Sequence, residues 1–255
     1  MDAREDRHDP VAKSLDYLVL VLAVVFGVGS VALFAWETRP VFVALHWSQP
    51  LALAWDALLS FVFFVQHSGM VRRSFRARLA AFVPARYDRA VYAISSGVAL
   101  ALVVVFWQRT DSHLLVMHGA PRWIMVGLGL AAVAVFVYSA YVLRPFDPLG
   151  LSAIWASLRH RPTRPSSFVV RGPYRWVRHP LYSCILVLFW ATPDLTADRL
   201  LLDILWTGWI IVGAKLEERD LVAEFGDAYR WYQRRVPMLV PWRGRVQFET
   251  EPAVG

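Results

Sequence analysis

Long apolar runs are the feature that most restricts what this chain of 255 residues can fold into. Residues 15–36 form a run of 22 with a single charge, and residues 123–143 form a run of 21 with none. Each is long enough to cross the roughly 30 Å hydrocarbon core of a bilayer as a helix. Residues 90–107 make a third run, and residues 51–65 make a fourth if Asp56 lies toward one end of the span or faces protein. We therefore expect a protein that spans a membrane several times.

Two shorter apolar stretches follow, at residues 181–192 and 200–214, and Pro193 lies between them. Proline cannot continue a helix, so these stretches predict a short membrane hairpin rather than one long span. Residues 217–235 are polar, with apolar or aromatic side chains at steps of three or four, which predicts an amphipathic helix with a break near Gly226. The predicted fold class is all-α, with about six transmembrane helices, of which the last two form the hairpin.

The order of these segments predicts two parts of the chain. Residues 1–143 would form a four-helix transmembrane block with a basic inner loop at residues 67–89. Residues 144–255 would contain a second inner loop, the hairpin and the amphipathic helix. We expect the functional core in this second part.

The distribution of basic residues explains the net charge of +7 without a nucleic-acid partner. Six helices leave seven flanking segments, and alternate segments carry 23 Lys and Arg on one side against 4 on the other. Because basic loops stay in the cytoplasm, this asymmetry predicts both termini on the cytoplasmic side. The lipid bilayer is the expected partner, and no obligate protein partner is inferred. The single cysteine, Cys184, excludes an internal disulfide and a cysteine-based metal site, and no metal site is predicted.

A basic segment with a His-Pro pair stands at the entrance to the hairpin. It reads Arg178-His179-Pro180-Leu181-Tyr182. Pro180 fits the first turn of a helix, so His179 would lie at the helix N-terminus, where free backbone N–H groups favour an anion. Arg178 could instead be a membrane anchor that contacts lipid phosphate.

The acidic pair Glu217-Glu218 stands at the exit of the hairpin. Glu218 shares a helix face with Leu221, Phe225 and Tyr229, so its carboxylate should point toward the surface that this face covers. A carboxylate held against aromatic rings suits a cationic ligand. The alternative is a solvated helix start.

A third polar group, Gln66-His67-Ser68, lies where the second span should leave the membrane on the same inner side. It is either a helix end whose backbone groups are satisfied by side chains or part of a functional site.

The C-terminal part of the chain resembles the signature of integral-membrane methyltransferases, which include isoprenylcysteine carboxyl methyltransferases and phospholipid N-methyltransferases. The resemblance lies within residues 171–241 and is carried by Arg178 to Tyr182, Glu217 to Leu221, Phe225-Gly226, Tyr229, Tyr232, Arg235-Val236-Pro237 and Pro241. Shorter strings, Gln66-His67-Ser68, Phe106-Trp107 and residues 188–193, are similar to the bacterial methanethiol S-methyltransferase branch and its NnrU-related members. Ser183 and Cys184 depart from the pattern, because many relatives have glycine there.

This resemblance implies S-adenosylmethionine as methyl donor, held at the cytoplasmic face of a bacterial inner membrane. The residues it implies as cofactor-binding are His179, Pro180, Tyr182, Glu217, Glu218, Tyr229 and Arg235. The chemistry of the cofactor fits these types. Its carboxylate suits the His-Pro element, its amino group and sulfonium suit the glutamates, and its adenine suits an aromatic ring.

The implied reaction transfers a methyl group to a small thiol, most simply methanethiol, which would give dimethyl sulfide. A thiol must lose its proton, which requires a base such as Glu218 or His67, or a cation such as Arg178 or Arg235 that lowers the pKa of the thiol. Glu218 with Arg178 are the candidate catalytic residues, and His67 is a further candidate. Two alternatives stay open. A prenylcysteine or phospholipid methyltransferase would share every motif, and a non-catalytic NnrU-like membrane protein of nitrogen-oxide metabolism would bind a cofactor or heme without transferring a methyl group.

Overall fold

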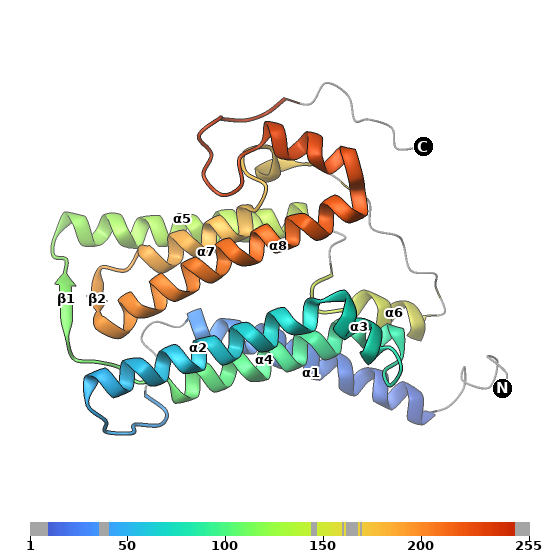
Figure 1. Ribbon diagram of the computed structural model, residues 1–255, viewed down its shortest axis with the longest axis horizontal. Helices are drawn as coiled ribbons and strands as arrows, with labels where there is room; N and C mark the ends of the chain where they lie inside the picture. Colours follow the sequence, from blue (N-terminus) through green and yellow to red (C-terminus); the bar gives the residue numbers. More distant parts are fainter. Residues whose placement is uncertain are drawn as a thin grey trace. The chain divides into compact units, whose positions relative to one another are not determined.

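The computed structural model describes residues 10–35, 41–143, 147–159, 161, 168 and 170–247, and most of them are helical (Figure 1). The four helices long and apolar enough to cross a membrane in this described part are α1 (Pro10–Ala35), α2 (Gln49–Val71), α4 (Asp88–Phe106) and α5 (Ala120–Val142). They coincide with the four long apolar runs, which confirms a helical membrane protein. The total of six spans and the cytoplasmic side of both termini stay predictions.

The chain forms two compact units. The first contains the described residues of 1–110 and 146–165, and the second contains those of 111–145 and 166–255. Helix α5 belongs to the second unit because it packs against α7 (Pro180–Trp190), whereas its hydropathy groups it with the first three spans. The functional division of the chain at residue 143 stays a prediction.

In the first unit, α4 packs against both α1 and α2. The two helices approach closely at Gly97 of α4, where a Cβ atom would lie only 2.2 Å from the carbonyl oxygen of Phe26 on α1. A small residue therefore lets the two helix backbones meet, as at many helix crossings in membranes. The short elements α3 (Arg73–Leu79), η2 (Ala85–Tyr87) and α6 (Leu151–Leu158) complete this unit, and α6 packs against α1 and η2.

Two buried carboxylates in the first unit are held by protein groups. Arg86 Nε donates to Asp16 Oδ1 at 3.1 Å, and the Tyr87 hydroxyl donates to the same oxygen. Asp56 is fully buried and accepts the backbone N–H of Gln108 at 2.9 Å. This burial confirms the expectation that Asp56 faces protein. A carboxylate that faced lipid at this depth would cost several kcal/mol.

In the second unit, α7 packs against α5 and against α8 (Ala197–Arg235), and the two helices α7 and α8 form the predicted hairpin (Figure 1). Pro193 lies in the turn, and β2 (Asp194–Thr196) follows it. This strand pairs antiparallel with β1 (His113–Val116), in a register that joins Val116 to Asp194 and His113 to Thr196. The two-stranded ribbon is a small addition to the expected all-α fold. Strands of three and four residues are too short to show a period in the sequence.

Ion pairs fix the ribbon end of the hairpin. Both carboxylate oxygens of Asp194 accept from Arg122 Nη1 on α5, at 2.9 and 2.8 Å. Arg199 Nε donates to buried Asp203 at 2.9 Å, and its Nη2 donates to the carbonyl oxygen of Phe189 at 2.8 Å. The second contact satisfies a carbonyl at the end of α7 that has no helical partner of its own.

Helix α8 is broken at Gly226, as the sequence predicts. The φ and ψ angles of Gly226 are 56° and −128°, and the helix changes direction there (Figure 1). Only glycine adopts this backbone conformation readily. The break turns the last helical segment, residues 227–235, away from the axis of the first.

We expect Gly226→Ala to destabilise the protein by about 1–3 kcal/mol, because alanine is strained at this positive φ while no neighbouring atom lies within 4 Å of the added Cβ. The measurement is denaturant unfolding in detergent. The matched control is Gly208→Ala in the regular part of α8, where the new Cβ also meets nothing and helix propensity favours alanine. Equal effects of both substitutions would contradict the assignment of strain to Gly226.

Candidate active site

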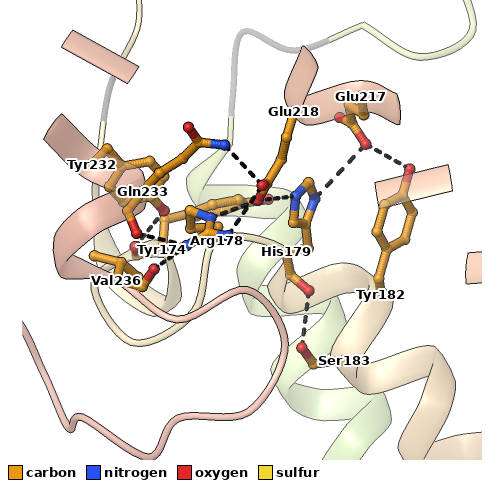
Figure 2. A network of polar contacts seen from close by, with 10 residues as sticks. All are labelled: Tyr174, Arg178, His179, Tyr182, Ser183, Glu217, Glu218, Tyr232, Gln233 and Val236. Atoms are coloured by element: carbon orange, nitrogen blue, oxygen red, sulfur yellow. Dashed lines mark hydrogen bonds and ion pairs between the residues drawn. The ribbon is translucent and has the colours of Figure 1, made fainter. Parts of the chain in front are cut away.

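The carboxylate of Glu218 is the centre of a polar network in the second unit (Figure 2). Its side chain is 9% exposed. Arg178 donates to both oxygens, from Nε to Oε1 at 2.5 Å and from Nη2 to Oε2 at 3.1 Å. Gln233 Nε2 donates to Oε2 at 2.9 Å, and His179 Nε2 lies 3.1 Å from Oε1. Both oxygens are therefore fully occupied by protein groups.

The segment before α7 is held in place by backbone hydrogen bonds to the segment after α8. The N–H groups of Arg178 and His179 donate to the carbonyl oxygens of Pro237 and Met238, at 2.9 and 3.1 Å. Pro180 then begins α7, where its missing N–H leaves no helical hydrogen bond unmade. The two ends of the hairpin thus converge, and the network forms where they meet.

Arg178 has a second role at the end of α8. Its Nη1 donates to the carbonyl oxygen of Gln233 at 3.0 Å and also to that of Val236. These carbonyls belong to the last helical turn, where no intrahelical donor remains. The guanidinium is 11% exposed and joins the start of the α8 amphipathic segment to its end. Every nitrogen of Arg178 is engaged in this way.

The pKa of Glu218 follows from these contacts. Burial opposes its ionisation, but hydrogen bonds from His179, Arg178 and Gln233 and the charge of Arg178 outweigh burial and lower the pKa from 4.5 to about 2. The group therefore stays a carboxylate throughout the physiological range.

Glu217 is the accessible partner of this buried carboxylate. Its side chain is 44% exposed, and Oε2 accepts the hydroxyl of Tyr182 at 2.8 Å. His179 Nδ1 lies 3.8 Å from the same oxygen. The rings of His179 and Tyr182 are stacked, with centroids 5.3 Å apart and planes inclined by 10° (Figure 2). The site thus presents one fixed and one open carboxylate beside two aromatic faces.

An aromatic cluster supports the C-terminal side of the network. Tyr229 is 2% and Tyr232 is 3% exposed, and both rings pack edge-on against Phe168. The hydroxyl of Tyr232 donates to the carbonyl oxygen of Tyr174 at 2.6 Å. Burial raises the pKa of Tyr229 and of Tyr232 far above the ordinary phenol value, so both stay neutral. Direct contact of Tyr229 with a ligand stays a prediction.

The structure therefore brings together most of the residues that the sequence predicts: Arg178, His179, Pro180, Tyr182, Glu217 and Glu218. Arg235 lies over the ring of Trp231, 4.0 Å from its centroid, and among the described residues it makes no hydrogen bond to either glutamate. Its role as a cofactor ligand stays a prediction. Gln233 was not anticipated, because nothing in the local pattern links it to Glu218, 15 residues earlier.

His67 belongs to the first unit and has polar and aromatic contacts there. Its Nε2 lies 2.8 Å from the hydroxyl of Tyr92, and its ring stacks on Phe63 with centroids 5.1 Å apart. Nearby, Gln66 Nε2 donates to Met70 Sδ at 2.9 Å. These contacts satisfy His67 within α2 and α4, and a catalytic role for it stays a prediction.

The chain is a helical membrane protein whose described part contains four helices long and apolar enough to cross a membrane and, in the second unit, a charged site where the ends of the hairpin converge. Within the part of the chain that is described, no three His, Cys, Asp or Glu side chains are grouped as metal ligands. The chain belongs to the NnrU family, whose model matches residues 57–224.

Within this family, the chain is similar to several curated proteins. The chain is 38% identical to a methanethiol S-methyltransferase of Pseudomonas sp. (strain GM41(2012)), over 78% of this chain and 76% of that protein. It is 36% identical to a methanethiol S-methyltransferase of Mycobacterium tuberculosis, over 90% of this chain and 94% of that protein. Nurim of Rattus norvegicus is more distant, at 25% identity over 67% of this chain and 68% of that protein. No solved structure matches the chain.

We expect Arg178→Gln to lower the free energy of unfolding by about 3 kcal/mol or more, because the buried charge of Glu218 loses its counter-charge and α8 loses a cap. Denaturant unfolding in detergent measures this. The matched control is Arg122→Gln, whose pair with Asp194 is 42% and 37% exposed and should contribute less than about 1 kcal/mol. A loss for Arg178→Gln as small as that of the control would refute a buried pair.

The depressed pKa of Glu218 predicts a pH dependence of stability. Because the folded pKa is about 2 and the ordinary value is 4.5, ionised Glu218 stabilises the fold above about pH 4.5, and this contribution disappears as the pH falls toward 2. The stability difference between the natural protein and Glu218→Gln should therefore shrink over that interval, as followed by thermal unfolding at a series of pH values. A difference that does not change with pH would show that Glu218 is not ionised with a depressed pKa in the fold.

Proposed function

We propose that this chain is a membrane methyltransferase that uses S-adenosylmethionine to methylate a small thiol, with methanethiol as the acceptor and dimethyl sulfide as the product. The observation that carries the proposal is the pair of neighbouring carboxylates, one buried and fixed and the other exposed, beside two stacked rings. The proposal is supported by the identity of 33–38% to relatives named methanethiol S-methyltransferase.

The donor set fits S-adenosylmethionine. The open carboxylate of Glu217 suits an ammonium group, and the permanent charge of Glu218 suits a nearby sulfonium. The outer face of the Tyr182 ring, whose inner face stacks on buried His179, suits an adenine ring or a cation. When bound, S-adenosylmethionine supplies a methyl group on a positively charged sulfur, which makes that methyl group electrophilic.

The residues of the network act by holding charge in place. Arg178 is fully engaged with Glu218 and with two carbonyls, so it positions the carboxylate and makes no contact of its own with the acceptor. Glu218, with a pKa of about 2, is a poor proton acceptor near neutral pH and serves as a fixed negative charge. The contribution of Glu218 to catalysis is thus electrostatic. The network also aligns the methyl donor with the acceptor, and methyl transfer depends most on this alignment.

The proposed location is a bacterial inner membrane with the site on the cytoplasmic side. The support is the set of four long apolar helices and the excess of basic residues on alternate loops. On this arrangement a small apolar thiol would reach the site from the bilayer, and a charged cofactor would reach it from the cytosol.

The proposal predicts that purified protein, given methyl-labelled S-adenosylmethionine and methanethiol, releases labelled dimethyl sulfide. Glu218→Gln should lower the rate by about 100-fold, the order of effect seen when one electrostatic stabiliser is removed from an active site. Arg78→Gln, an exposed substitution on α3, is the control and should leave the rate unchanged.

The products separate the proposal from its rivals. Label recovered in extracted lipid, with no volatile product, would assign the acceptor to prenylcysteine or phospholipid and overturn the thiol assignment. No transfer at all, together with a Soret band in the purified protein, would favour the non-catalytic, heme-binding alternative and overturn the class.

A further inference from the structure

A cleft of about 670 Å³ opens on α8 beside the network. Four cationic side chains line it: Lys215, Arg219, Arg230 and Arg234. Glu218 and Gln233 line it as well, so the cleft and the network share two residues. The cations are exposed, whereas Glu218 is buried.

The break at Gly226 explains why the cations gather. Lys215 and Arg219 stand one helical turn apart before the break, and Arg230 and Arg234 stand one turn apart after it. A straight helix would carry the second pair away from the first, since residues 11 to 19 apart lie roughly 16 to 28 Å apart along the axis. The non-helical glycine returns the second pair to the same cleft.

These cations are largely uncompensated. Arg230 pairs with exposed Asp227 at 3.0 Å. Within the described part of the chain, Lys215, Arg219 and Arg234 have no carboxylate within ion-pair distance. The carboxylate of Glu218 is already paired with Arg178, and His179 lies against the same oxygen, Oε1. The cleft therefore presents an excess of positive charge, which concentrates small anions and favours their charged form.

We propose that this cleft binds the methyl acceptor as its thiolate anion, with Lys215 and Arg219 as the residues that favour the loss of the thiol proton. This inference rests on the proposed function and names how the acceptor is activated. It also explains how the thiol loses its proton when Glu218 cannot act as the base. The carboxylate of Glu218 already accepts hydrogen bonds from Arg178 and Gln233, and its low pKa makes it a poor base. Glu218, which would stabilise the cationic methyl donor, and Lys215 and Arg219, which would stabilise the anionic acceptor, then line the same cleft.

The step balances without a further reactant. The thiol proton leaves to water, and the lone pair of the thiolate sulfur forms the new bond to the methyl carbon. The bond between that carbon and the sulfonium sulfur breaks with its electron pair, so that sulfur becomes neutral. No oxidant, reductant or general base is consumed.

The test is the pH dependence of kcat at saturating methanethiol in the double variant Lys215→Gln, Arg219→Gln, because kcat reports the pKa of the bound thiol. We expect the acidic limb to move up by about one pH unit and kcat near neutral pH to fall about tenfold, since a nearby cation lowers an acid's pKa by about that amount. Arg78→Gln, a cation outside the cleft, should keep the natural profile. An unchanged profile in the double variant would overturn the inference.

A second readout does not depend on catalysis. Calorimetric titration with methanethiol, in the presence of S-adenosylhomocysteine and in two buffers of different ionisation enthalpy, counts the protons released per thiol bound. We expect about one proton for the natural protein and clearly fewer for the double variant. Binding without proton release would overturn the inference even if methyl transfer occurs. Absence of methyl transfer in the natural protein would instead contradict the proposed function, so the two failures are distinguishable.

Discussion

The carboxylate of Glu218 can stay ionised in a buried position only because protein donors point at both of its oxygens. These donors come from two places that are far apart in the chain: the segment before α7, and the last turn of α8 beyond Gly226. An uncompensated charge at this depth would cost several kcal/mol, so both segments must meet the part of α8 that carries Glu218 for the unit to be stable. Arg178 adds to this constraint, because the same guanidinium also satisfies carbonyls at the end of α8. The geometry of the site is therefore a consequence of how the hairpin ends are held together.

Much of this arrangement follows from local features of the sequence. The apolar runs locate the four long helices, Pro193 marks the turn of the hairpin, and Gly226 marks the break in α8. The meeting of the His-Pro segment and the Glu217-Glu218 pair at one site is also predicted, but their direct pairing is not, because the sequence assigns them to opposite charges of one ligand.

Other features depend on contacts that no local pattern reports. The role of Gln233 requires the chain to turn back at Gly226, and the ribbon of β1 and β2 requires two short segments about 80 residues apart to pair. The packing of α5 on α7 also cannot be predicted from a local pattern. Hydropathy locates a membrane span but does not show which other helix it packs against. The helix-face pattern does distinguish Glu218 from Glu217, and the burial of Glu218 beside exposed Glu217 confirms it. The pattern does not show how the buried charge is held, which depends on the tertiary contacts of Arg178, His179 and Gln233.

The proposed chemistry uses this difference. A positively charged methyl donor needs a negative charge that stays ionised near neutral pH. A carboxylate with a pKa of about 2 provides it. An anionic acceptor needs positive charge within reach of the same place, which the basic cleft on α8 provides. Neither group has to move a proton during methyl transfer, so the site can act through fixed electrostatics and alignment.

In the proposed site, Glu218 holds a positively charged sulfur through its own fixed charge. Calorimetric titration of the natural protein and of Glu218→Gln with S-adenosylmethionine and with neutral-sulfur S-adenosylhomocysteine tests it directly. We expect the substitution to weaken S-adenosylmethionine binding by about tenfold more than S-adenosylhomocysteine binding, since one charge interaction is worth about 1.4 kcal/mol or more at a partly buried site. Equal weakening of both ligands, or no binding of either to the natural protein, would contradict it.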